Sequence, residues 1–178
     1  MENLNQLREQ FPDAARDIKI NITNVIAPGA LNAAQAWGVA MSTAYAARNE
    51  KLIKAVHSDA KMAGIEDAVL DDAKAAAILM GMNNVYYRFR HLVEKPSYME
   101  KPARLRMNRL AKPATTKLAF ELYSLAASAI GGCGTCMQAH ERVVVQGGLT
   151  EDLVQEAIRI AATINATAVS LEVAPLVT

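Results

Sequence analysis

The sequence predicts an all-α protein that folds as a single compact multi-helix domain over residues 1–178. Alanine is abundant, aromatic residues make up only 5% of the chain, and hardly any stretch alternates apolar and polar residues as a half-buried strand would. Because 52% of the 178 residues are hydrophobic, the chain can bury a full core without a disulfide or metal staple.

The first helices are predicted from their start signals. Residues 4–10 form a short helix, and Pro12 suits the first turn of a second helix that runs towards Val25. The N–H groups of a first turn have no acceptor within the helix, so the N–H that proline lacks is not missed there. Asn32 is a good N-cap for a third helix that extends to about Arg48.

Two further helices are expected in the middle of the chain. Residues 50–62 form one, with Gly64 at its C-terminal cap, and residues 66–90 form a longer one, in which Gly81 marks a close crossing or a break. Two prolines make residues 93–113 an irregular connection. The long helix is expected to bury an apolar stripe of Val69, Ala73, Ala76, Ala77, Met80 and Val85.

The last third reads as three helices. Thr115 or Thr116 caps a helix that ends near Ile130, a second helix covers residues 133–146 and ends at a Gly-Gly pair, and Thr150 caps the last one. Acidic residues directly after Thr150 suit the dipole of that helix.

An internal repeat is also visible. Residues 62–69 resemble residues 146–154, with one residue inserted in the second copy. Each copy follows a helix that contains a histidine, His57 or His140, and leads into a long Ala-rich helix. The chain is therefore predicted to consist of two related helical halves, of which only the second contains cysteines.

Composition excludes several classes of function. A formal net charge of +1, with Lys and Arg scattered along the chain, gives no support to a nucleic-acid or membrane-surface role. The apolar run at residues 75–82 is too short for a membrane span, and residues 1–5 lack the pattern of a secretory signal, so we expect a cytoplasmic protein. Five arginines are expected to form a solvated face rather than an anion site: Arg88, Arg90, Arg104, Arg106 and Arg109.

The segment at residues 131–140 concentrates the reactive side chains, because it contains both cysteines and one of the three histidines. A Cys-x-x-Cys pair can close a disulfide and reopen it, and its thiolates are stabilised at a helix N-terminus or beside a base. In a helix over residues 133–146, Cys133, Cys136 and His140 share one face. His140 is then placed to accept the proton of Cys136.

Three interpretations of the cysteine pair are possible. A zinc site would have only His140 as a third ligand, and a pair of core cysteines would not need the surrounding glycines, so a redox pair is favoured. Glu121 lies on a helix whose local sequence suits a solvated carboxylate; facing the thiols, it would instead orient His140 or relay a proton. His57 and His91 have no cysteine neighbours and are interpreted as structural.

The spacing of Glu121, Cys133, Cys136 and His140 resembles the active-site signature of the alkylhydroperoxidase D family. These four residues at these offsets are far more specific than a lone Cys-x-x-Cys. The resemblance covers nearly the whole chain, through residues 17–21, 35–38, 80–88, 105–108 and from 165 onward.

That resemblance implies an all-α fold of the carboxymuconolactone decarboxylase-like kind, a homotrimer and a role in peroxide defence. Members of the family regenerate a peroxiredoxin partner, alkyl hydroperoxide reductase C, and are weak peroxidases themselves. Their electrons come from dihydrolipoamide on a lipoyl-bearing 2-oxo acid dehydrogenase component. The resemblance implies no bound metal, haem, flavin or nicotinamide.

The resemblance also implies roles for single residues. Cys136 would react with peroxide or with the partner, Cys133 would resolve the product, and Glu121 and His140 would relay protons. Thr135 departs from the family, whose members carry a histidine between the two cysteines, so a second proton shuttle is missing.

Two alternatives come from other classes of function. A decarboxylase-like or dehalogenase-like enzyme would use His140 and Glu121 for proton transfer and would keep its activity without the thiols. A redox-sensing or zinc-stabilised interaction module would have no catalytic activity.

Overall fold

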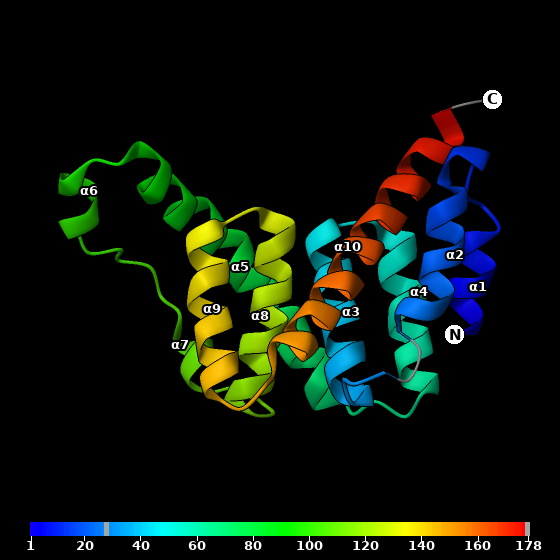
Figure 1. Cartoon of the computed structure of the whole chain (residues 1–178), viewed down its shortest axis with the longest axis horizontal. Helices are drawn as coiled ribbons and strands as arrows, with labels where there is room; N and C mark the ends of the chain where they lie inside the picture. The colour runs from blue at the N-terminus through cyan, green and yellow to red at the C-terminus, as the bar shows by residue number, and fades with distance from the viewer. Residues whose placement is uncertain (27–28, 177–178) are drawn as a thin grey trace.

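Helices dominate the computed structural model, which describes residues 1–26 and 29–176 (Figure 1). No strand occurs within these two ranges, which confirms the predicted all-α class. None of the helices in the described part of the chain is long and apolar enough to span a bilayer. In chain order the elements are α1 (Glu2–Arg8), the 3₁₀ turn η1 (Asp13–Ala15), α2 (Arg16–Val25), α3 (Ala33–Ala47), α4 (Glu50–Met62), α5 (Asp67–Val93), α6 (Pro96–Glu100), α7 (Asn108–Ala111), α8 (Lys117–Gly131), α9 (Gly134–Gln146), α10 (Glu151–Val173) and η2 (Ala174–Leu176).

Side-chain caps fix where several helices begin. The side chain of Asn32 accepts the N–H of Gln35, whose own side chain accepts the N–H of Asn32, so α3 starts with a capping box. Thr116 and Thr150 cap α8 and α10 as predicted, each accepting the N–H three residues later. Proline at 12 precedes a 3₁₀ turn rather than opening α2 directly.

The core forms where α3, α5 and α8 pack against one another, with α10 against α3 and α8. Helices α1, α2 and α4 lie at one end of the molecule and α9 at the other, beside α5 and α8 (Figure 1). At the crossing of α3 and α8, a Cβ atom on Gly38 would lie 2.2 Å from the ring of Tyr123. Glycine therefore lets α3 and α8 approach closely enough for the Tyr123 hydroxyl to donate to the Ala34 carbonyl at 3.1 Å.

The two predicted halves are present as two helix triplets, α3–α4–α5 and α8–α9–α10. Helices α3 and α8 each have 15 residues, and α4 and α9 each have 13. The turns after α4 and α9 use the same hydrogen bonds, including Ile65 N–H to Ala60 O and Leu149 N–H to Val144 O, both 3.0 Å. Gly64 occupies the left-handed region in the first turn.

All these boundaries are related by one constant offset along the chain, at which Gly64 corresponds to Gly148 and Asn49 to Cys133. The two copies of the repeat therefore align without the one-residue insertion that the sequence alone suggested. For the same reason, His57 and His140 are not equivalent positions.

Three predictions for α5 and the connection that follows it are wrong. Helix α5 runs unbroken through Gly81, where an added Cβ would meet nothing within 4 Å, and Val85 is 61% exposed rather than buried. The connection at 93–113 is also not wholly irregular, because it contains α6 and α7.

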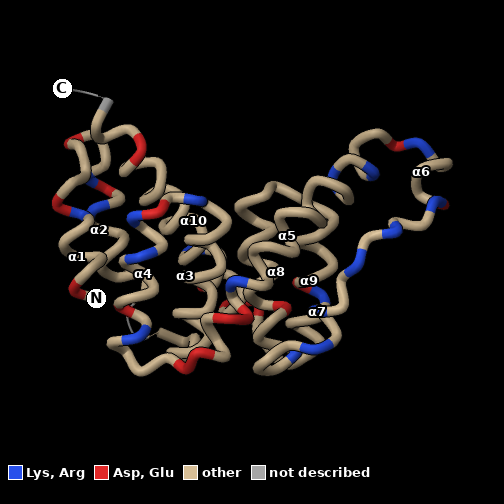
Figure 2. Tube along the Cα trace, turned by 180° about the vertical axis from the view of Figure 1, so that it is seen from behind, with Lys and Arg blue, Asp and Glu red and all other residues tan. Residues whose placement is uncertain are grey.

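Residues 91–106, here called the arm, project away from the helix bundle (Figure 1). Lys and Arg positions recur along its trace (Figure 2). The five arginines singled out in the sequence do not converge on one site, because Arg90 donates to Met99 O and Arg88 to Gly131 O, while Arg109 pairs with Asp71.

Candidate active site

The turn between α8 and α9 places both cysteines at the start of a helix. Gly132 ends α8 in the left-handed conformation, with φ of 65°, which glycine adopts without steric cost. Cys133 is the N-cap of α9 rather than part of the helix, and its sulfur accepts the N–H of Cys136 at 3.3 Å. The positive end of the α9 dipole therefore acts on both sulfurs.

Cys133 and Cys136 are joined by a disulfide, with their Cα atoms 5.3 Å apart. Both are buried, Cys133 completely. The Cys136 sulfur lies 4.0 Å from the carbonyl oxygen of Asn83 on α5. The bond is thus packed between the first turn of α9 and the middle of α5, and it is largely buried.

Glu121 on α8 is buried, at 8% exposure, and its Oε2 lies 2.6 Å from Nδ1 of His140 on α9. The local sequence of α8 favoured a solvated carboxylate, and that interpretation is wrong. A buried carboxylate needs a polar partner, and the imidazole Nδ1–H supplies it. The other ring nitrogen, Nε2, lies 3.2 Å from the sulfur of Met80.

The imidazole of His140 does not hydrogen-bond to either sulfur within the described ranges, since its two nitrogens face Glu121 and Met80. Instead, Cys136 and His140 line the same cavity, which has a volume of about 290 Å³. The two residues are thus connected through this cavity, rather than by the direct contact that the helix spacing suggested.

The rest of the cavity is mostly apolar. Its walls come from three elements: Tyr87 from α5, Ala139 from α9, and Met107 and Leu110 from residues 107–115, here called the α7 segment. Thr135 lies beside Cys136. A hydrophobic pocket with few polar groups is typical of small-molecule sites. The residue types around it therefore suit a small ligand with an apolar part.

Asp72 on α5 holds the α7 segment against the site. Its buried carboxylate accepts hydrogen bonds from Thr115 N and Oγ1, both at 2.7 Å, from Ala114 N at 2.9 Å, and from Arg109 at 2.8 Å. Burial alone would raise the pKa of Asp72, but the bonds from Thr115, Ala114 and Arg109 outweigh it and lower the pKa below its usual value.

The sequence interpretation missed Met80, Asn83 and the walls from α5 and the α7 segment. A signal was present for Asn83, because it continues the buried stripe of α5 three residues after Met80, where an apolar residue is expected. No local pattern marks Met107 and Leu110, which reach the cavity only through tertiary contacts.

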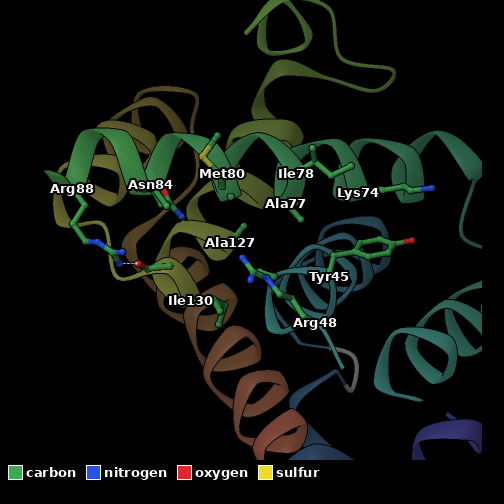
Figure 3. A pocket seen from close by; sticks show the side chains of 14 residues that line it. Tyr45, Arg48, Lys74, Ala77, Ile78, Met80, Asn84, Arg88, Ala127 and Ile130 are labelled. Carbon is green, nitrogen blue, oxygen red and sulfur yellow. Dashed lines mark hydrogen bonds between the residues drawn. The ribbon is translucent and has the colours of Figure 1, made fainter. Parts of the chain in front are cut away.

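A second cavity of about 580 Å³ lies between α5 and the ends of α3 and α8 (Figure 3). Arg48 points into it, while Lys74 extends away from it (Figure 3). Met80 lies at its wall, but the two cavities share no lining residue, and neither cysteine reaches it. It is therefore separate from the Cys136 site.

Metal-ligating side chains do not gather elsewhere in the described residues, which contain no group of three or more His, Cys, Asp or Glu suited to a metal. His57 and His91 are exposed on α4 and α5. The reactive groups that the fold brings together are therefore the four predicted ones: Glu121, Cys133, Cys136 and His140.

Comparison with known proteins agrees with this geometry. Residues 96–178 match the model of the carboxymuconolactone decarboxylase family. The chain is 62% identical to "Alkyl hydroperoxide reductase AhpD" of Anaeromyxobacter sp. (strain K), with 98% of this chain and 93% of that protein covered. It is 44% identical to the protein of that name from Rhodospirillum centenum, with 96% and 91% covered. The chain therefore belongs to the alkyl hydroperoxide reductase AhpD family.

Proposed function

We propose that the protein is a thiol peroxidase that reduces alkyl hydroperoxides through a cycle of its two cysteines. The observation that carries this proposal is the buried Cys133–Cys136 disulfide, whose Cys136 lines one cavity together with His140, the partner of Glu121. A reactive thiolate beside a positioned acid–base pair is the arrangement that peroxide reduction needs.

The reaction follows from thiol chemistry. The Cys136 thiolate attacks the terminal oxygen of the hydroperoxide, so that a sulfur–oxygen bond forms as the oxygen–oxygen bond breaks. His140 gives the leaving alkoxide its proton, and the product is an alcohol. Cys133 then attacks the sulfenic acid at Cys136, water leaves, and the disulfide forms. Two electrons have passed from the dithiol to the peroxide.

Dihydrolipoamide is the proposed electron donor. Its two thiols reduce the disulfide by exchange and are oxidised to a disulfide themselves, which balances the cycle without a bound cofactor. The apolar walls at Tyr87, Met107 and Leu110 suit the alkyl chain of such a donor. We also propose that the reduced dithiol passes electrons to the peroxiredoxin partner alkyl hydroperoxide reductase C, and that the lipoyl group belongs to a 2-oxo acid dehydrogenase component.

The assembly is proposed to be a homotrimer in the cytoplasm. Exposed apolar side chains on one face of α5, Ile78, Val85 and Leu92, and the projecting arm support self-association. The carboxymuconolactone decarboxylase family match also keeps a second chemistry open, in which Glu121 and His140 transfer protons without the thiols.

Single-turnover kinetics test the function. The reduced protein should consume one cumene hydroperoxide per chain and lose both titratable thiols. Cys133→Ser should leave a sulfenic acid that dimedone traps at Cys136, and Cys136→Ser should consume no peroxide. Equal residual activity in the two variants would contradict the assigned roles. Catalysis that survives replacement of both cysteines would support the proton-transfer chemistry instead.

A further inference from the structure

Asn83 is an unusual residue in the wall of the active-site cavity. It lies on α5 next to Cys136, is only 5% exposed, and its backbone carbonyl is the group that contacts the Cys136 sulfur. Its side-chain oxygen is buried without a hydrogen-bond partner in the described part of the chain. Its amide nitrogen is not among the buried atoms that lack a partner, so the unpaired buried atom of this side chain is the oxygen.

Its neighbour in the chain shows how such an amide is normally accommodated. Asn84 is equally buried, and its Oδ1 accepts the hydroxyl of Ser128 at 3.0 Å. Asn84 also faces the separate, larger cavity (Figure 3). Burying a polar atom without a partner destabilises a protein, so an amide whose oxygen is unpaired directly beside a reactive sulfur calls for a ligand that completes its hydrogen bonds.

We propose that Asn83 is a catalytic residue that binds the oxygens of the hydroperoxide. This inference rests on the proposed function. With the peroxide in the cavity, the amide N–H donates to the oxygen that leaves, where negative charge develops as Cys136 attacks. The sulfur–oxygen bond forms, the oxygen–oxygen bond breaks, and the alkoxide is held by Asn83 until His140 protonates it.

The same placement fits the alkyl hydroperoxides of the proposed function. Asn83 is the amide in a wall whose other members, Tyr87, Met107 and Leu110, are largely apolar. One polar contact at the reacting end and apolar contacts along the remainder suit an organic hydroperoxide with a hydrophobic group. Such a substrate gains binding energy along its alkyl part that hydrogen peroxide cannot gain, so we expect a preference for the organic peroxide.

The test replaces Asn83 with leucine, which has a similar shape and no polar atoms. Reduced Asn83→Leu should react with cumene hydroperoxide about 10²-fold more slowly than wild type. Alkylation of Cys136 by iodoacetamide should be unchanged, because that reaction develops no charge on oxygen. The melting temperature should rise, since an unpaired buried oxygen has been removed. Unchanged peroxide kinetics, or equal slowing of both reactions, would overturn the proposal.

The internal repeat provides a matched control. Thr167 on α10 occupies the position that corresponds to Asn83, is fully buried, and its hydroxyl has no partner in the described residues. Thr167→Val should also raise the melting temperature but leave the peroxide rate unchanged. If Asn83→Leu does not fold, Asn83→Ser serves, because its short hydroxyl cannot reach the peroxide and the same slowing is expected. Wild-type protein that never consumes peroxide would refute the proposed function itself.

Discussion

Glu121 shows how a single carboxylate acquires a role from its surroundings. On α8 it follows Phe120 and precedes Leu122, both fully buried, so the helix carries it into the core. Its 2.6 Å contact with His140 satisfies it there and fixes the orientation of the imidazole ring. In the proposed mechanism the carboxylate therefore acts through the histidine, as a positioning and proton-relay group.

Replacing Glu121 with glutamine tests this role. Glu121→Gln keeps the shape and a hydrogen bond to His140 but removes the charge and the base, so turnover with dihydrolipoamide and cumene hydroperoxide should fall by about 10²–10⁴. The pH profile of turnover should change in Glu121→Gln, and it should change in the same way in His140→Gln. Circular dichroism should show unchanged helix content in both variants. Normal turnover with an unaltered pH profile in Glu121→Gln would make the pair structural.

Thr135 offers a second test at this scale. It lines the cavity beside Cys136. Thr135→His should add a group that titrates between about pH 5 and 8. The pH profile of the peroxide reaction should therefore gain a transition in that range. Superimposable profiles for the variant and wild type would show that position 135 takes no part in proton transfer.

At the scale of elements, the site depends on how two segments meet α5. Helix α9 brings Cys136 and His140 from one side, and the α7 segment brings Met107 and Leu110 from the other. The short α7 has no buried residue of its own, so its position depends on the hydrogen bonds that Asp72 accepts. Asp72 is therefore a support for one wall of the cavity.

Removing the charge of Asp72 should loosen this wall. Asp72→Asn leaves N–H and O–H donors around a weaker acceptor, and at pH 7 the free energy of unfolding in urea should fall by roughly 2–3 kcal/mol. The pKa of Asp72 is lower in the folded state than in the unfolded state. Its ionised carboxylate therefore stabilises the fold fully above the unfolded-state pKa, and this stabilisation is lost as the pH falls through the folded-state pKa. Wild type and Asp72→Asn should thus converge in stability near the acid limit.

Asp71→Asn is the control, because Asp71 also pairs with Arg109 but is largely exposed, and exposed ion pairs contribute little. Its unfolding free energy should stay close to that of wild type at every pH. If Asp71→Asn is as destabilised as Asp72→Asn, the loss comes from Arg109 and not from the buried carboxylate.

The sequence predicts those parts of the fold that local signals determine. Asn32, Thr116 and Thr150 cap helices where their side chains reach nearby N–H groups, which is a local event. The burial of Glu121 was not predictable from its neighbours, because its partner His140 comes from another helix. Val85 lies on the outward face of α5 with Ile78 and Leu92, and only the tertiary structure shows that this face is exposed.

At the scale of the whole molecule, the repeat explains why only one half is reactive. By the constant offset, Cys136, His140 and Glu121 correspond to Leu52, Val56 and Trp37, all buried in the core. Asn49, the residue that corresponds to Cys133, caps α4 as the cysteine caps α9. The first half thus uses the same positions for packing, and in the proposed mechanism the second half uses them for chemistry.

The surface of α5 leads to the last prediction. Ile78, Val85 and Leu92 recur every seven residues, lie on one helical face, and are 66%, 61% and 69% exposed. A stripe of this kind, next to the projecting arm, is expected to be covered in the proposed trimer. Val85→Glu should therefore shift the mass measured by light scattering from trimer to monomer, whereas Ile20→Glu on α2, equally a change of an exposed apolar residue, should not.

The chemistry should survive this dissociation. The disulfide, the Glu121–His140 pair and Asn83 all come from one chain, so a Val85→Glu monomer should keep its single-turnover rate with cumene hydroperoxide. Loss of that rate together with loss of the trimer would mean that a neighbouring chain completes the site. A wild-type protein that is monomeric at all concentrations would instead leave the α5 stripe to another partner and refute the trimer.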